Sequence, residues 1–246
     1  MRIESAHLGD GVRLPVLMTD EHECPYLPDR AAREALLLTP VDDAAFYQQL
    51  MDWGFRRSER FFYRPGCDGC RACTPIRVPV ERFAESRSQG RVRRRNADVE
   101  VRVAEPTLDE ERWSLFTRYQ LEVHDKPMLR APAEYVGVFC DSPIESIEMA
   151  YYVRGRLVGI GLLDVCPSAL SSVYFYYDPR EARRSLGVFS GLCEVEECRR
   201  RNLPWWYLGF YIAGCRKMEY KSRFRPYELL DPDGVWRSPG ADGAAA

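Results

Sequence analysis

Four cysteines carry the most distinctive chemistry in this sequence of 246 residues. Cys67, Cys70 and Cys73 follow a C-x-x-C-x-x-C spacing, and Cys24 lies further upstream. Thiols at this spacing can reach one metal ion from a tight turn, which the neighbouring glycines allow. The pattern indicates either a soft-metal site, with zinc or an iron–sulfur cluster, or a loop of reduced and partly buried thiols.

The overall composition of the sequence indicates in which kind of protein and cellular compartment these thiols occur. The sequence has nine cysteines, a net charge of −2 and an apolar fraction of 46%, which is ordinary for a globular protein. Its start lacks the apolar segment of a signal peptide, and no apolar run approaches the roughly 18 residues of a membrane span. We therefore expect a cytoplasmic protein with reduced thiols, built as one large domain or two small ones.

Arginines supply the second chemical signal. Arg56 and Arg57 precede an aromatic run at 61–63, close in sequence to the cysteines. A denser group follows, with few acidic residues near it, at Arg82, Arg87, Arg91, Arg93, Arg94 and Arg95. Guanidinium groups bind phosphates through paired hydrogen bonds, so this run favours a polyanion partner, RNA above all. The alternative is a solvated helix face or a linker.

The first half of the chain is expected to position these residues on a few short elements. Hydrophobic periodicity and alternation predict a strand or short helix at 33–38, a helix at 41–53, strands at 74–80 and 97–106, and a helix at 107–123. Gly54 is a good residue to end the first of these helices. Thr107 and Glu110 form a capping box that would begin the second.

The second half has a clearer order of elements. We expect a hairpin of strands at 146–153 and 157–164, a third strand at 173–177, a helix from about 184 to 202 with Ser185 as its N-cap, a fourth strand at 205–208, a short helix at 213–220 and a last strand within 227–236. This order is typical of the N-acyltransferase fold, whose helix N-terminus binds phosphates. The loop carries only part of that motif, at Arg183, Arg184 and Gly187. Many α+β domains share this order, so function does not follow from it.

Several sequence blocks resemble one known family across nearly the whole chain. They are Cys24-Pro-Tyr-Leu-Pro, Gly54-Phe-Arg-Arg-Ser, the segment 63–77, Ser86-Arg-Ser-Gln, Tyr174-Phe-Tyr-Tyr-Asp-Pro, Arg184-Ser-Leu-Gly and the segments 207–212 and 215–221. The chain resembles the aminoacyl-tRNA–protein transferases of the N-degron pathway, and most closely their bacterial leucyl-transferring subgroup. The resemblance implies an α+β fold, with a cysteine-rich N-terminal domain at 1–96 joined to a GNAT-like acyltransferase domain with a mixed sheet at 97–237. The tail at 238–246 is expected to be disordered.

The resemblance also implies a reaction. Leucine would pass from leucyl-tRNA to the α-amine of a protein that begins with Asp or Glu, which marks that protein for degradation. The expected partners are leucyl-tRNA and such proteins, with no membrane and no DNA. The aminoacyl ester is already activated, so no cofactor is required for the chemistry. A zinc ion or an iron–sulfur cluster at Cys24, Cys67, Cys70 and Cys73 would then be structural or regulatory.

Roles for individual residues follow from this reaction. Arg56 and Arg57 are candidates for a cationic pocket that binds the acidic side chain, with Tyr176 as a further substrate-binding residue. Tyr174, Asp178 and Tyr207 are candidates to orient the amine or relay its proton, although strand tyrosines often only pack. We expect the tRNA to contact Arg87, Arg91, Arg93, Arg94, Arg95, Arg184, Lys217 and Lys221, the two lysines from one face of a helix.

Three other functions stay open at this point. An arginyl-tRNA-dependent transferase of the same family is possible, because no residue that we can read selects the donor. A non-enzymatic regulator would use the cysteines and the arginine run to bind metal and nucleic acid. A small-molecule acetyltransferase would need coenzyme A and a fuller glycine-rich loop than this sequence has.

Overall fold

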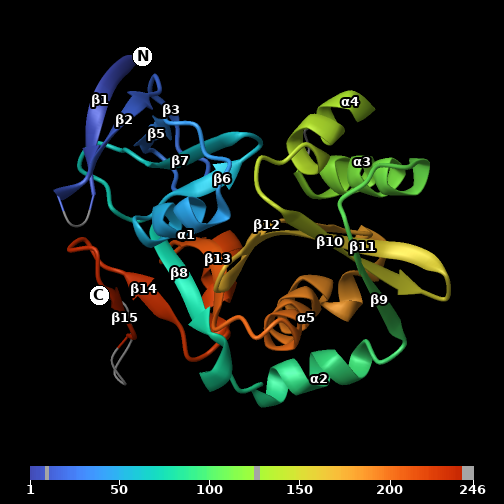
Figure 1. Ribbon diagram of the computed structural model, residues 1–246. Helices are drawn as coiled ribbons and strands as arrows, with labels where there is room; N and C mark the ends of the chain where they lie inside the picture. The colour runs from blue at the N-terminus through green and yellow to red at the C-terminus, as the bar shows by residue number, and fades with distance from the viewer. Residues whose placement is uncertain (9–10, 125–127, 240–246) are drawn as a thin grey trace.

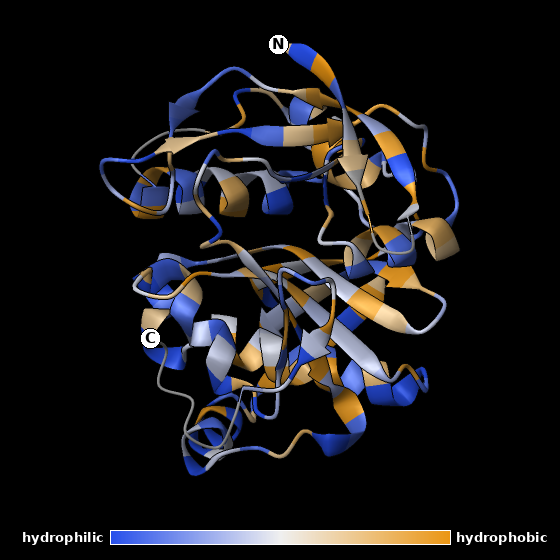
Figure 2. Cartoon of the chain, turned by 90° about the vertical axis from the view of Figure 1, so that its left-hand side faces the viewer, coloured by the Kyte–Doolittle hydropathy of each residue, from blue (hydrophilic) through white to orange (hydrophobic). Residues whose placement is uncertain are grey.

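The computed structural model of the chain describes residues 1–8, 11–124 and 128–239. Its elements form two larger sheets and one short strand pair, β3 (His22–Glu23) with β4 (Ala31–Ala32). The smaller of the two sheets lies at the N-terminal end, and the larger sheet carries helices on both faces (Figure 1). In Figure 2 the N-terminal part lies above the larger sheet, and hydrophobic residues recur along the strands of both parts.

The N-terminal sheet is antiparallel throughout its described pairs. Its strands, in spatial order, are β1 (Arg2–His7), β2 (Arg13–Met18), β5 (Glu34–Leu37), β7 (Phe61–Pro65) and β6 (Arg56–Ser58). β5 settles the open assignment at 33–38 in favour of a strand. The alternation of half-buried and buried residues along β5 explains this choice, because Ala35 and Leu37 face the core at every second position.

Helix α1 (Ala44–Asp52) confirms the helix predicted over 41–53. The Asp43 side chain accepts hydrogen bonds from two backbone N–H groups of the first turn, which caps the helix. Gly54 follows the helix at a φ of 84°, a left-handed conformation that glycine adopts at little cost. The reversal of chain direction at Gly54 leads directly into β6, and so places Arg56 and Arg57 against the core.

The larger sheet has eight strands. In spatial order they are β15 (Trp236–Arg237), β14 (Glu228–Leu230), β8 (Thr74–Pro79), β13 (Trp205–Tyr211), β12 (Ala169–Tyr177), β11 (Arg156–Cys166), β10 (Ser146–Val153) and β9 (Val99–Ala104). β12 and β13 pair in parallel, while the other described pairs are antiparallel. The predicted mixed sheet is therefore confirmed.

Helices cover both faces of this sheet (Figure 1). One face carries α5 (Leu186–Arg200) and α2 (Arg87–Arg95), and the other carries α3 (Glu110–His124) and α4 (Pro132–Tyr135). Shorter helical segments are η2 (Val80–Arg82), η3 (Val136–Cys140), η4 (Pro179–Arg184), α6 (Arg216–Glu219) and η5 (Tyr220–Arg223). The Asp109 carboxylate, rather than the Thr107 side chain, caps the start of α3 by accepting a hydrogen bond from the Arg112 backbone N–H.

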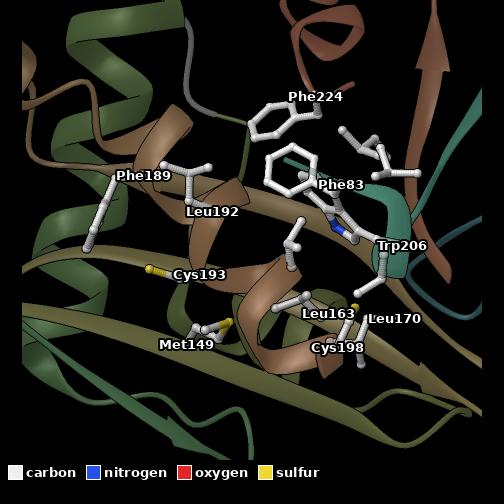
Figure 3. Packing of buried hydrophobic residues seen from close by; sticks show 14 of the residues in the cluster. Phe83, Met149, Leu163, Leu170, Phe189, Leu192, Cys193, Cys198, Trp206 and Phe224 are labelled. Atoms are coloured by element: carbon white, nitrogen blue, oxygen red, sulfur yellow. The ribbon is translucent and has the colours of Figure 1, made fainter. Parts of the chain in front are cut away.

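Three hydrophobic clusters hold these layers together. The largest lies between α5 and the sheet, where Phe189, Leu192 and Trp206 pack together (Figure 3). A second cluster lies under α3 and α4. The third joins α1 and the N-terminal sheet to residues of the larger sheet, among them Ala169 and Tyr207. Each fully buried large apolar side chain contributes about 1.5–3 kcal/mol.

The boundary predicted at 96/97 stays a prediction. β8 precedes that boundary in sequence, yet it pairs with β13 and β14 inside the larger sheet. Of the tail predicted to be disordered, 240–246 lie outside the described residues. The fourth strand was expected to end at Leu208, but β13 continues through Gly209. Gly209 has a φ of 83°, which accommodates a shift in the pairing register between β13 and β8.

Candidate active site

The two parallel strands of the larger sheet separate after a short contact. β12 and β13 pair over three residues each, and the last pair joins Ser171 to Tyr207. β12 then continues to Tyr177 and β13 to Tyr211 without further pairing to each other. We call this divergence the fork. It leaves backbone groups of both strands available at one place in an otherwise continuous sheet.

A cavity of about 370 Å³ lies between the N-terminal part of the chain and Phe210, which belongs to the β13 arm of the fork. Its lining residues are Cys24, Pro25, Tyr26, Ala32, Arg33, Glu34, Leu36, Ser58, Glu59, Phe61, Tyr63, Pro65, Cys67, Cys73 and Phe210. Fourteen of these fifteen come from the N-terminal part, and Phe210 comes from β13. The cavity therefore connects the cysteine-rich segment with the strand that forms one arm of the fork.

Three of the four predicted metal ligands line this cavity. Cys24, Cys67 and Cys73 line it, and Arg30 donates a hydrogen bond to the Cys70 sulfur at 3.5 Å. Burial, followed by the neighbouring thiols, raises the pKa of the Cys73 thiol to about 12. Within the described residues, no group of three or more His, Cys, Asp or Glu side chains lies close enough together to hold a metal ion. In the structure as it stands, these thiols therefore do not form a ready-made metal site, and a metal at this place stays a prediction.

Arg57 has a carboxylate partner inside the protein. Its Nε and Nη2 donate to the two carboxylate oxygens of Asp164 at 2.8 and 2.6 Å, and its Nη1 donates to the Glu59 carbonyl at 2.6 Å. Both side chains of the ion pair are almost fully buried. These bonds correct the expectation that Arg57 binds an acidic substrate, because Asp164 already neutralises it.

Arg56, the preceding residue, is in the opposite situation. It is 4% exposed, and its guanidinium carbon lies 5.3 and 5.8 Å from the ring centroids of Tyr207 and Phe210. Nη2 donates to the Gly209 carbonyl at 3.0 Å, while Nε and Nη1 have no hydrogen-bond partner. Burial lowers the pKa of Arg56. Arg56 thus keeps two donor nitrogens without an internal acceptor, and its predicted role in binding an acidic side chain stays a prediction.

Lys221 accompanies Arg56 in the interior. Its Nζ donates to the Phe210 carbonyl at 2.8 Å, and the residue is 8% exposed. Burial, with a smaller effect from Arg56, lowers the pKa of Lys221 to about 7. The expected exposed helix face shared with Lys217 is wrong, because α6 gives way to a 3-10 turn at Tyr220, and only Lys217 is exposed.

A second hollow, of about 220 Å³, lies at the start of α5. Its lining residues are Tyr177, Ala182, Ser185, Leu186, Gly187, Val188 and Tyr220. Ser185 occupies the N-cap position, as predicted, in a left-handed conformation and without a capping bond from its side chain. The first backbone N–H groups of a helix carry partial positive charge and suit an anion.

Two of the predicted substrate-site tyrosines face away from this hollow. The Tyr174 hydroxyl accepts a hydrogen bond from Gln120 of α3 at 2.7 Å, and Tyr176 is fully buried against Tyr135 of α4. Side chains alternate along a strand, so Phe175 and Tyr177 point to the opposite face, toward α5. This alternation places Tyr174 and Tyr176 away from the second hollow, and their predicted contact with the substrate stays a prediction.

The other two predicted catalytic groups are held by internal partners. The Asp178 carboxylate is fully buried and pairs with Arg118 at 3.2 Å and Arg156 at 2.5 Å. The Tyr207 hydroxyl donates to Asp52 at 2.6 Å and accepts from Arg77 at 3.2 Å. Both groups hold the sheet to its surroundings, and their predicted role toward the amine stays a prediction.

Arg82 of the predicted arginine run lies in η2 and pairs with Glu228, whereas the other five arginines belong to α2. Ser86 and Gln89 form a capping box, and Arg87, Arg91 and Arg94 follow at helical spacing on one side. These three arginines are exposed, and none has an ion pair among the described residues. We call them the α2 stripe. Gln89 points inward and donates to the Arg223 carbonyl, which fixes the helix to the body of the protein.

The other basic residues predicted to bind tRNA divide into two groups. Arg93 pairs with Glu85 and Glu196, and Arg184 pairs with Asp98 and Glu181. Arg95 donates to the Arg183 carbonyl at 2.6 Å, which brings the end of α2 beside the start of α5. The α2 stripe therefore leads toward the second hollow.

Comparisons with known proteins identify the family. Residues 22–91 match the model of the arginine-tRNA-protein transferase N terminus, and residues 111–231 match the model of its C terminus. The chain is 41% identical over 223 residues to an aspartate/glutamate leucyltransferase of Pseudomonas fluorescens (strain SBW25), covering 89% of this chain and 94% of that protein. It is 37% identical over 227 residues to the enzyme of the same name from Marinobacter nauticus, covering 91% and 95%.

The chain belongs to the aminoacyl-tRNA–protein transferase family. As a member of that family it is an aminoacyltransferase, which confirms the resemblance read from its sequence blocks. Among solved structures, it is similar to the crystal structure of FemX, with a TM-score of 0.52, 8% sequence identity and coverage of 93% of this chain and 85% of that one. This likeness concerns the fold alone, and it confirms the GNAT-like type expected for this aminoacyltransferase. No helix within its described residues is long and apolar enough to cross a membrane.

Proposed function

We propose that this aminoacyltransferase moves leucine from leucyl-tRNA to the α-amine of proteins that begin with Asp or Glu. The observation that carries the proposal is about 40% identity, over nine-tenths of the chain, to proteins named aspartate/glutamate leucyltransferases. The buried, unpaired Arg56 supports it from the structure, because an acidic acceptor needs a cation. In this proposal the reaction takes place in the cytoplasm and marks the acceptor for degradation.

The leucyl-tRNA would lie along one side of the molecule. The exposed arginines of the α2 stripe supply charge for the phosphate backbone of the acceptor stem. The end of α2 lies beside the start of α5, so the 3′ end of the tRNA would reach the second hollow near Tyr177 and Tyr220. The reacting ester would then enter the fork, between the unpaired ends of β12 and β13.

The chemistry in the fork is an acyl transfer between two bound reactants. The acceptor amine attacks the ester carbonyl carbon, a carbon–nitrogen bond forms, the carbon–oxygen bond breaks, and the ribose oxygen leaves with the proton that the amine loses. An α-amine has a pKa of about 7.7–8.0, so much of it is already neutral near pH 7.5. Positioning of amine and ester is accordingly the main contribution required of the protein.

Transfer of labelled leucine tests the proposal. Leucyl-tRNA and arginyl-tRNA are offered in parallel, with peptides that begin with Asp, Glu, Arg or Lys. We expect label in the Asp and Glu peptides, from leucyl-tRNA alone. Transfer from arginyl-tRNA would place the chain with the arginyltransferases. Failure with both donors, with thiols reduced, would favour the alternative of a non-enzymatic regulator that binds nucleic acid.

A metal ion or iron–sulfur cluster at Cys24, Cys67, Cys70 and Cys73 stays a prediction. Cys24, Cys67 and Cys73 line one cavity, and all three other thiols lie near enough to Cys73 to affect its pKa, which supports a shared role. The reaction described above requires no redox step. Metal and sulfide analysis of protein purified without oxygen tests the prediction, and the Cys24→Ser variant is the comparison. If the four thiolates hold a metal ion or cluster, the wild-type protein should contain it in stoichiometric amount, and the Cys24→Ser variant should lose it.

A further inference from the structure

Two cations lie buried side by side without a carboxylate partner. Arg56 and Lys221 are 4% and 8% exposed, and neither forms an ion pair within the described residues. A side-chain Cβ at Gly209 would lie 3.5 Å from Lys221 Nζ and 4.0 Å from Arg56 Nε, so both groups flank the same backbone position. Burying an unpaired charge is costly, and two adjacent like charges increase that cost. Such an arrangement indicates a site that an anion completes.

The partners that these cations do have are backbone carbonyls of one strand. Arg56 donates to Gly209 and Lys221 to Phe210, both on the arm of β13 that runs past the fork. Neutral carbonyls hold the two side chains in place without cancelling their charge. Arg56 Nε and Nη1 keep hydrogen atoms with no acceptor. Both cations are therefore oriented in advance and remain free to bind a carboxylate.

The cavity of the cysteine-rich part adjoins this place, with Arg56 and Lys221 lying behind its lining residues. Tyr63 and Phe210 line it, and the same two residues adjoin Arg56, Tyr63 by strand pairing and Phe210 beneath the guanidinium. Cys73, also in the lining, lies near enough to Lys221 to affect its electrostatics. A volume of about 370 Å³ suits a small ligand, such as the first residues of a peptide.

We propose that Arg56 and Lys221 together form the anion site that binds the acidic side chain of the acceptor's first residue, entered through this cavity. The inference rests on the proposed function and adds which groups select the acceptor. Arg57, the sequence neighbour, is excluded because Asp164 neutralises it. Lys221 is moved from the tRNA surface, where the sequence placed it, to the acceptor pocket. The site lies beside the fork, so a bound carboxylate holds the acceptor's amine near the proposed place of the ester.

Arg33 is the competing cation, because it lies in the cavity lining. Its Nη1 and Nη2 reach Asp68 and Glu21 at 3.4 Å each, so acidic groups already surround it. A substrate carboxylate at Arg33 would face these carboxylates and Glu34, which lines the same cavity. The interior pair has no acidic group at hydrogen-bond distance, and electrostatics therefore favours Arg56 and Lys221.

The test compares two peptides that differ only in Asp or Asn at their first residue, with leucyl-tRNA as donor. Asn has nearly the shape of Asp and no charge. In Arg56→Gln and in Lys221→Met we expect kcat/KM for the Asp peptide to fall about 100-fold, with little change for the Asn peptide and an unchanged KM for leucyl-tRNA. Arg60→Gln and Arg223→Gln are the matched controls, because both side chains are exposed on the same segments.

The outcomes separate this inference from the proposed function. A wild-type enzyme that fails to transfer leucine to the Asp peptide would overturn the function itself. Wild-type transfer, with an unchanged Asp-to-Asn ratio in both variants, would overturn the anion site alone. A loss of that ratio in Arg33→Gln instead would move the site to the cavity rim, and a raised KM for leucyl-tRNA would assign the two cations to a tRNA phosphate. If Arg56→Gln does not fold, the Asp-to-Asn ratio is measured in Lys221→Met and Arg56→Lys instead.

Discussion

Arg56 and Arg57 are adjacent in β6 and both are buried, but their guanidinium groups lie in different surroundings. Around Arg57, Asp164 and the Glu59 carbonyl satisfy the charge and the hydrogen bonds. Around Arg56, aromatic rings and a carbonyl satisfy only part of them, and a second cation lies nearby. Burial alone is common to both regions. The absence of an internal anion distinguishes a residue suited to binding from one that holds the fold together.

The largest effect that we expect is on stability, in Arg57→Gln. The substitution leaves the buried Asp164 carboxylate without its cation, which should cost about 3–5 kcal/mol. Arg56→Gln removes a charge that has no internal partner and should cost far less. Urea unfolding of the two variants measures the difference. Equal losses of unfolding free energy would contradict the distinction between the two regions.

The second effect concerns exposed, unpaired cations. The triple variant Arg87→Gln, Arg91→Gln and Arg94→Gln should raise the KM for leucyl-tRNA at least tenfold, because it removes the α2 stripe. The salt dependence of tRNA binding should weaken by about 2–3 in the log–log slope. Stability and the Asp-to-Asn ratio should not change.

A triple variant of equal charge is the control for the stripe. Arg60, Arg102 and Arg200 are exposed, lie on elements other than α2 and form ion pairs with neighbouring carboxylates. Their replacement by Gln should leave the KM for leucyl-tRNA and its salt slope near the wild-type values. If both triple variants changed the KM for leucyl-tRNA equally, the overall charge of the protein, and not the position of the α2 stripe, would account for tRNA binding.

The third effect is a pH dependence of stability caused by Lys221. Its pKa is about 7 in the folded protein and about 10.4 in the unfolded chain, so the unfolded state binds more protons between these values. Lys221 should make the wild type more stable as pH rises through this window, by up to about 1.4 kcal/mol per pH unit. Unfolding at several pH values should show that Lys221→Met loses this rise, while Arg223→Gln keeps it. Parallel curves for Lys221→Met and wild type would show that Lys221 is solvated.

The smallest effect compares two glycines with positive φ. Gly209→Ala and Gly214→Ala both place a side chain at a φ near 80° and should each cost about 1 kcal/mol. Only Gly209 adjoins Arg56 and Lys221, whereas a Cβ at Gly214 meets nothing within 4 Å. Gly209→Ala should therefore also raise the KM for the Asp peptide. A similar KM in the two variants would show that the backbone at Gly209 does not orient the cations.

The sequence predicted much of the secondary structure. Hydrophobic periodicity located α1 and α5 to within a few residues, and the order of hairpin, strand, helix and strand predicted the acyltransferase type of sheet. These patterns depend on neighbours within a few positions. The segment at 33–38 stayed ambiguous because four residues of a strand carry too little periodicity.

The candidate site was harder to predict because its geometry depends on distant residues. Arg56 and Arg57 are equivalent in the sequence, and only the fold brings Asp164 to one and Gly209 to the other, 107 and 153 positions away. Tyr174 and Tyr176 were chosen by residue type, although strand alternation could have separated them from Tyr177. Lys221 was placed on a surface because a continuous helix was assumed, and the change to a 3-10 turn buries it.

A crystal structure of the enzyme with a short peptide that begins with Asp tests the central claim most directly. We expect the peptide in the cavity, with its first side-chain carboxylate within hydrogen-bond distance of Arg56 and Lys221 and its α-amine toward the fork. A carboxylate bound at Arg33 on the cavity rim, with Arg56 still unpaired, would contradict it.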